Sequence, residues 1–126
     1  MKKKGSTSDF IKQRNAELRA AFFSQRQYST SDIVIEKAVR TPASRFWVDP
    51  DRARDVISRI EKDPGLLEGM YPERRRMYDA LIRKYREIKR QFPGRSKIHS
   101  VTMAIYSGAP EFYLSTSRAR SIVYGL

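Results

Sequence analysis

Four arginines between residues 73 and 91 recur at spacings that place them on one side of a helix. At about 100° per residue they lie opposite an apolar stripe that runs from Met77 to Ile88. The four are Arg76, Arg83, Arg86 and Arg90. They would span about 21 Å of helix, and one guanidinium group can donate two parallel hydrogen bonds to a phosphate. The spacing predicts a surface that contacts the phosphates of a nucleic-acid backbone; a solvated helix face is the alternative.

Two further segments offer basic or hydroxyl side chains for the same purpose. One is the N-terminus, and the other is the start of a helix expected from residue 116. The candidates are Lys2, Lys3, Lys4, Ser117, Arg118 and Arg120. For the two arginines an ion pair with a neighbouring carboxylate is an equally open interpretation, because each flanks the apolar stripe of its helix.

The net charge favours a polyanionic partner. The chain has 26 Lys and Arg against 14 Asp and Glu, a formal charge of +12, and such a balance favours nucleic acid over anionic membrane. We therefore expect a small non-enzymatic protein that binds nucleic acid, double-stranded DNA first, through basic helix faces. RNA is one alternative partner. The other alternative is a protein–protein adaptor or structural component of a phage or mobile element. We expect no small-molecule substrate, and the sequence leaves the oligomeric state open.

Catalysis and metal binding have little support in the sequence. His99 is the only histidine, and cysteine is absent, which excludes disulfides and thiolate metal sites. Asp49, Asp51 and Asp55 suit the first turns of a helix, where the dipole favours negative charge, and they lack the glycine and glutamate of a calcium loop. We expect no catalytic residue, cofactor or metal.

The sequence also predicts no signal peptide and no membrane-spanning segment. The basic start is followed by residues 5–9, which are polar or small rather than apolar, and no apolar run approaches the length of a membrane span. We expect a cytoplasmic protein with no membrane partner, associated with the nucleoid if it binds DNA. Residues 1–7 are predicted to be a flexible basic tail.

An internal repeat organises the rest of the chain. Residues 43–57 return as residues 109–123, with five of the fifteen positions identical, including an Arg-Ala-Arg run. A self-similarity of this kind indicates a duplication with an offset of 66 residues. We predict one compact domain over residues 8–126, built from two repeats, about 8–63 and 72–126.

The predicted fold is all-α, with about six helices in two pseudo-symmetric halves. Apolar periodicity and helix caps place the helices at 9–26, 32–40, 50–62, 73–91, 97–106 and 116–126. Asp49, Ser96 and Ser115 are the expected N-caps of three of them. Short extended runs, 45–48 and 111–114, precede the third and sixth helices, and we expect the two runs to pair, or at least to pack, across a pseudo-twofold axis.

The stretch Ala-Pro-Glu-Phe-Tyr-Leu-Ser at 109–115, followed by Arg-Ala-Arg at 118–120, resembles a motif in small basic proteins of Bacteroides-type bacteria and their mobile elements. Residues 42–48 resemble the same motif with its proline moved. Some of those proteins are described as DNA-binding or helix-turn-helix-like. The resemblance implies helix-turn-helix-like packing and DNA binding, and it carries no site residue over to this chain.

Overall fold

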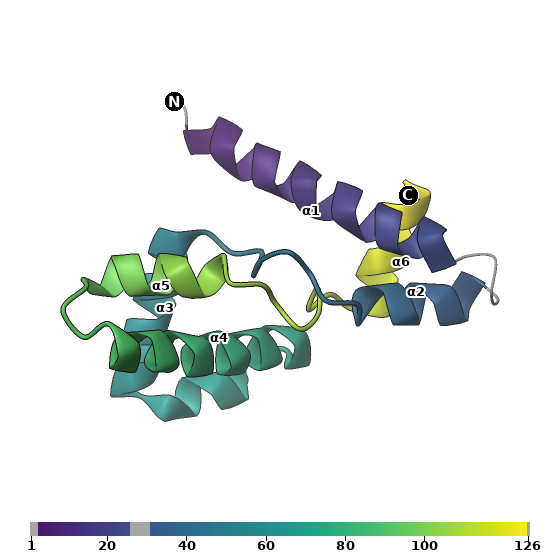
Figure 1. The fold of residues 1–126 in the computed structure, drawn as a ribbon. Coiled ribbons are helices and arrows are strands. Elements are labelled where there is room, and N and C mark those ends of the chain that lie inside the picture. Colours follow the sequence, from purple (N-terminus) through teal and green to yellow (C-terminus); the bar gives the residue numbers. More distant parts are fainter. Residues whose placement is uncertain (1–2, 26–30, 126) are drawn as a thin grey trace. The chain divides into compact units, whose positions relative to one another are not determined.

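The computed structural model describes residues 3–25 and 31–125, with side chains from residue 9 in the first range and from residue 32 in the second. The described chain is all-α, which confirms the predicted class. Its α-helices are α1 (Lys3–Gln25), α2 (Ser31–Val39), α3 (Pro50–Lys62), α4 (Pro72–Gln91), α5 (Lys97–Ile105) and α6 (Thr116–Tyr124) (Figure 1). A short 3₁₀ helix, η2 (Pro64–Gly69), follows α3.

Two segments differ from the sequence-based expectation. Helix α1 begins at Lys3, so the part of the predicted flexible tail that the structure describes is helical. The reason is local, because residues 3–8 contain no proline to remove a helical hydrogen bond. The linker after α3 contains η2, where Pro64 occupies the first helical position and the side chain of Asp63 accepts a hydrogen bond from the amide of Gly65.

Three helices begin with the predicted side-chain caps. The carboxylate of Asp49 accepts from the amide of Arg52 at 3.1 Å, and the hydroxyl of Ser115 accepts from the amide of Arg118 at 3.0 Å. Ser96 caps α5 in the same way. Each cap satisfies one amide that has no partner within its helix, so these helix starts are fixed by residues within four positions of one another.

The chain divides into two compact units. Unit 1 comprises residues 1–43 and 110–126, and unit 2 comprises residues 44–109. Unit 1 therefore contains α1, α2 and α6, and unit 2 contains α3, η2, α4 and α5. The predicted halves would group α1 with α2 and α3, and α4 with α5 and α6. Instead, unit 1 combines α1 and α2 with the sequence-distant α6, and unit 2 is the continuous stretch that contains α3, α4 and α5.

In unit 1 the helices α1, α2 and α6 all pack against one another. Leu18 and Phe22 of α1 are at most 2 % exposed, and they share the core with Ile35 of α2 and with Ile122 and Val123 of α6. In unit 2, α5 packs against both α3 and α4. The unit 2 core includes the fully buried side chains of Ile57, Tyr78, Leu81, Val101 and Ile105.

The two runs that were predicted to be extended form no β-strand in the described residues. Tyr113 has a φ of 57°, in the left-handed region, so the run at 111–114 is not continuously extended, which corrects that expectation. The amide of Phe46 donates to the carbonyl of Ile105 in unit 2, and the amide of Phe112 donates to the carbonyl of Val39 in unit 1. Each run is thus tied to the end of a helix in its own unit. The pairing of the two runs stays a prediction.

Candidate nucleic-acid interface

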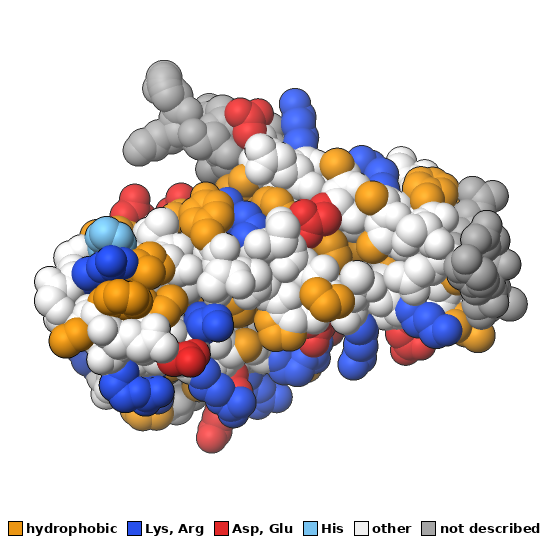
Figure 2. Space-filling model, in the orientation of Figure 1, with side chains coloured by type: hydrophobic (Ala, Val, Ile, Leu, Met, Phe, Trp, Pro, Cys, Tyr) orange, Lys and Arg blue, Asp and Glu red, His pale blue; other side chains and the backbone are white. Residues whose placement is uncertain are grey.

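The arginine face of α4 has the exposure that the sequence predicted. Arg76, Arg83, Arg86 and Arg90 are all exposed, and the opposite face buries Tyr78, Leu81, Ile82, Tyr85 and Ile88. The arginines and the buried set alternate because the helix repeats every 3.6 residues. In Figure 2, Lys and Arg side chains gather along the lower edge of the view, over the region of α4, with single acidic side chains among them.

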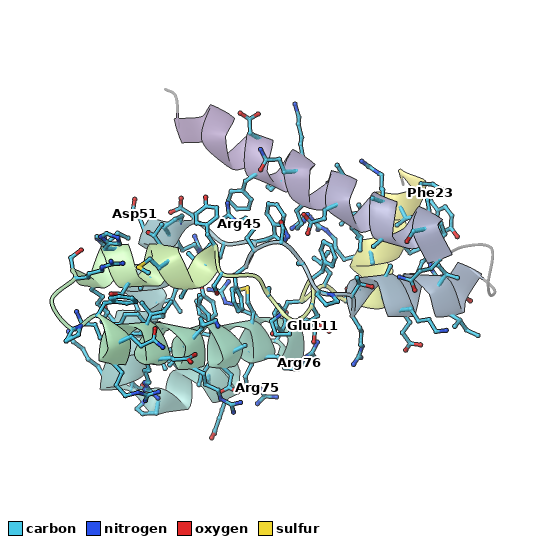
Figure 3. All side chains as sticks on the ribbon, viewed as in Figure 1. Phe23, Arg45, Asp51, Arg75, Arg76 and Glu111 are labelled. Carbon is cyan, nitrogen blue, oxygen red and sulfur yellow. The ribbon has the colours of Figure 1, made fainter. Side chains whose placement is uncertain are left out.

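The side chains next to the arginine face of α4 leave most of its positive charge accessible to a ligand. Arg83 forms a 2.9 Å ion pair with Asp79 one turn earlier. Both side chains are at least half exposed, and such surface pairs contribute about 0–1 kcal/mol. A phosphate can therefore replace the carboxylate at small cost. Arg75 and Arg76 extend from the first turns of α4 (Figure 3), and Arg75 is also exposed. The face is arginine-rich along its whole length.

The other predicted contacts stand differently. Lys2 lies outside the described residues, and Lys3 and Lys4 are described only as part of the α1 backbone. Ser117 and Arg118 are exposed in the first turn of α6. Arg120 forms an ion pair with Asp32 of α2 at 2.7 Å. The assignment of these side chains to a binding surface stays a prediction.

The repeated Arg-Ala-Arg run separates into two roles. The second arginine of each copy is ion-paired: Arg120 with Asp32 at 2.7 Å, and Arg54 with Asp55 at 3.4 Å and Asp51 at 3.9 Å. The first arginine, Arg52 or Arg118, has no ion pair within the part of the chain that the structure describes. The first arginine of each copy can therefore bind a ligand without breaking an ion pair of the described residues.

Arg118 lines a hollow of unit 1 between α1 and α6. The hollow has a volume of about 450 Å³ and is lined by Asn15, Arg19, Arg118, Ser121, Ile122 and Gly125. Arg14 is close to it, since the positive charge of Arg118 and, more strongly, burial lower the pKa of the Arg14 guanidinium. Arg14 and Arg19 were not predicted from the sequence, because no pattern within α1 shows that α6 packs against it.

Arg52 lines a corresponding hollow in unit 2. This hollow has a volume of about 450 Å³ and is lined by Arg52, Asp55, Val56, Arg59 and Arg74. The guanidinium of Arg74 lies over the ring of Tyr78, 5.4 Å from its centroid. Arg59 and Arg74 were also missed from the sequence. The repeat relates Arg52 to Arg118, but it relates Arg59 to Gly125, so it gives no signal for Arg59 or Arg74.

Arg45 is a further arginine that the sequence analysis did not assign, and its role is structural. It is 8 % exposed. Its guanidinium donates to the carbonyls of Phe46 and Val48 and to the hydroxyl of Tyr106, and it lies over the rings of Trp47 and Tyr106 at 5.0 and 4.5 Å. Burial lowers its pKa. These bonds hold the segment before α3 in place.

The described residues contain no group of three or more His, Asp or Glu side chains that could hold a metal ion. His99 is exposed in the first turn of α5, and its amide donates to the cap Ser96. No helix within the described ranges is long and apolar enough to cross a membrane. The expectation that the protein is not an enzyme stays a prediction.

Comparisons with known proteins give no further constraint. No protein-family model matches the sequence, and no curated protein or solved structure is significantly similar to it. The function has to be argued from the geometry and charge of the chain itself.

Proposed function

We propose that this protein binds nucleic acid, double-stranded DNA in the first place, by contacting backbone phosphates and without catalysing a reaction. The observation that carries the proposal is the exposed arginine face of α4. Four guanidinium groups there lie on the side of the helix opposite its buried residues. They follow one line over about 21 Å, as contacts along a phosphate backbone require.

The distribution of charge supports this proposal. Unit 1 carries 11 Lys and Arg against 5 Asp and Glu, and unit 2 carries 15 against 9, so each unit has a net charge of +6. The excess is therefore a property of both folded units rather than of one terminal segment. A uniformly basic protein attracts a polyanion over long range and concentrates near it. A protein with this function would act in the cytoplasm, at the nucleoid.

Binding through phosphates has a definite dependence on salt. Each neutralised phosphate releases counterions, which lowers the logarithm of the association constant by about 0.9 for each tenfold increase in salt. The variant Arg83→Glu/Arg86→Glu/Arg90→Glu removes three such contacts. We expect it to bind a random-sequence duplex much more weakly and to reduce the salt slope by about 2.7. Fluorescence anisotropy with a labelled duplex of about 20 base pairs, which is two turns of the double helix, measures both the affinity and the salt slope.

The matched control is Lys12→Glu/Lys37→Glu/Arg40→Glu, which makes the same change in net charge at exposed positions of α1, α2 and the residue after α2. We expect the control to weaken binding less and to change the slope by less than about one. Far-UV circular dichroism verifies that both variants are folded. Equal effects of the two variants would show that the α4 face has no special role, and an absence of salt-dependent binding by the unmodified protein would refute the proposal.

We further propose that the chain consists of two copies of a three-helix sequence whose third helices are exchanged. The bounds of the elements support this: α2 spans 31–39 and α5 spans 97–105, α1 and α4 end at 25 and 91, and α3 and α6 begin at 50 and 116. All four of these offsets equal 66. The bonds from Phe46 to Ile105 and from Phe112 to Val39 are related by the same offset. In this proposal α6 completes the unit of α1 and α2, and α3 completes that of α4 and α5.

A protein–protein adaptor is the second candidate function, and exposed aromatic side chains favour it. Phe23, near the C-terminal end of α1, is 52 % exposed (Figure 3), and Tyr124 of α6 is 46 % exposed. Both rings contact Phe22 edge-on, with centroid separations of 5.2 and 6.0 Å. The variant Phe23→Ser/Tyr124→Ser separates the functions: an adaptor would lose its partner in a pull-down, whereas DNA binding would be unchanged.

A further inference from the structure

The hollows of unit 1 and unit 2 are lined by guanidinium groups that form no ion pair with a carboxylate of the described residues. We infer that each hollow binds one phosphate group. The inference rests on the proposed function in one respect, since a backbone phosphate of the nucleic acid is then the natural occupant. It adds two defined positions to a surface that is otherwise a line of exposed charge.

The hollow of unit 1 is positively charged and has polar groups already oriented. The Nε of Arg19 donates to the carbonyl of Ile122 at 3.1 Å, which fixes the Arg19 guanidinium beside the last turn of α6. Arg14 donates through Nε and Nη2 to the side-chain oxygen of Asn15, at 3.1 and 2.9 Å. The amide nitrogen of Asn15 is thereby left as a donor at the wall of the hollow.

Among the described residues, no carboxylate lines this hollow and its arginines form no ion pair. Arg118 and Arg14 therefore repel one another, and this repulsion adds to the effect of burial in lowering the pKa of Arg14. An anion bound between these groups would remove the repulsion and accept hydrogen bonds from several donors. Guanidinium groups favour an oxyanion such as phosphate, because each can donate two parallel hydrogen bonds to its oxygens.

The hollow of unit 2 has the same excess of positive charge. Arg52, Arg59 and Arg74 line it with a single carboxylate, Asp55, and that carboxylate is paired with Arg54 at 3.4 Å. The ring of Tyr78 lies beneath the guanidinium of Arg74. The hydroxyl of Tyr78 is fully buried and has no hydrogen-bond partner among the described residues. The three arginines are thus available to an anion, with a fixed aromatic ring behind one of them.

The two hollows occupy equivalent positions. The first hollow is lined by Arg118, Ser121 and Ile122 of α6 and by Gly125, which follows α6. The second is lined by the α3 residues Arg52, Asp55, Val56 and Arg59. Each pair is separated by 66 residues. The same face of the third helix therefore borders a basic hollow in both units. The linings contain one apolar side chain each, which suits an ionic ligand better than an apolar one.

The first test uses inorganic phosphate and the whole protein. In ¹H–¹⁵N spectra of the arginine Nε–H groups, phosphate should shift the signals of Arg19, Arg118, Arg52 and Arg74 saturably. The exposed Arg86 and Arg90 should shift less, and chloride at equal ionic strength should leave all of them near their starting positions. If the signals from the hollows move no more than those of Arg86 and Arg90, the sites are refuted.

The second test asks whether DNA uses the sites. We expect Arg118→Gln and Arg52→Gln each to reduce the salt slope of duplex binding by about one. The controls Arg40→Gln and Arg54→Gln remove the same charge from an exposed position after α2 and from an ion-paired position of α3, and they should leave the slope unchanged. Far-UV circular dichroism confirms that each variant is folded.

The outcomes distinguish the two proposals. If DNA binding depends on the α4 arginines but is unaffected by Arg118→Gln and Arg52→Gln, the function stands and a backbone phosphate is overturned as the occupant of the hollows. If the protein shows saturable phosphate shifts but does not bind duplex DNA, the proposed function fails and the hollows are sites for free phosphate or another phosphate-bearing ligand.

Discussion

Replacing Arg45 by methionine tests whether a buried guanidinium holds the segment before α3 in place. Arg45 is 8 % exposed. It donates to the carbonyl of Phe46 at 3.0 Å, to that of Val48 at 2.9 Å and to the Tyr106 hydroxyl at 2.9 Å. Methionine can fill much of the same volume but donates no hydrogen bond, so the substitution removes the bonds with little change in packing.

The magnitude follows from the groups that lose a partner. The carbonyl of Phe46 keeps a donor, because it also accepts from the amide of Val48 at 3.0 Å. The carbonyl of Val48 loses the donor that Arg45 provides, and a buried carbonyl left without a donor costs about 1–3 kcal/mol. Each lost cation–π contact, to Trp47 and to Tyr106, costs about 0.5–1 kcal/mol. Removing the guanidinium also ends its own desolvation penalty, which is the main reason that its pKa is lowered, and this gain offsets part of the loss. We therefore expect a net destabilisation of about 1–3 kcal/mol.

Urea denaturation gives the free energy of unfolding, and Trp47 provides a local probe, because the chain has one tryptophan and its ring lies 5.0 Å from the Arg45 guanidinium. Arg45→Lys keeps the charge but can replace only part of the hydrogen bonding, so it should lie between the wild type and Arg45→Met. The control Arg86→Met removes an exposed arginine from α4 and should change stability by less than about 0.5 kcal/mol. A loss below about 0.5 kcal/mol for Arg45→Met would refute the reasoning.

Two further predictions concern single side chains whose environments are described above. Tyr78→Phe removes a buried hydroxyl that has no partner in the described residues. We therefore expect the substitution to be neutral or to stabilise the protein by up to about 1 kcal/mol. A loss of stability above about 1 kcal/mol in urea denaturation would show that the hydroxyl is hydrogen-bonded. Burial raises the pKa of Tyr78 above its unfolded value, so the unfolded chain loses this proton first as pH rises past about 10; wild-type stability should then fall more steeply with pH than that of Tyr78→Phe. Ser115→Ala and Asp49→Ala each remove a helix cap, and each should lower the free energy of unfolding by about 1 kcal/mol in urea denaturation. The control Ser58→Ala, within α3, should cost less. Equal losses for the cap variants and the control would contradict the capping role.

The sequence by itself determined the helices and their caps. The starts of α3, α5 and α6 are given by Asp49, Ser96 and Ser115, which bond to amides three residues later. The exposed arginine face of α4 follows from the helical period in the same way. These features depend on contacts within one or two turns, so a pattern of neighbouring residues is enough to predict them.

Only the tertiary structure decided which helices share a unit and which side chains from distant segments bond to one another. The bond from Arg19 to the carbonyl of Ile122 joins residues 103 positions apart, and the pair of Arg120 and Asp32 joins residues 88 positions apart. Arg118 and Arg120 look alike in sequence, but among the described residues Arg120 forms an ion pair and Arg118 does not. The burial of Arg45 and the two hollows likewise depend on which segments meet in each unit. Local periodicity does not predict these tertiary contacts, because they arise from the packing of apolar faces that are distant along the chain.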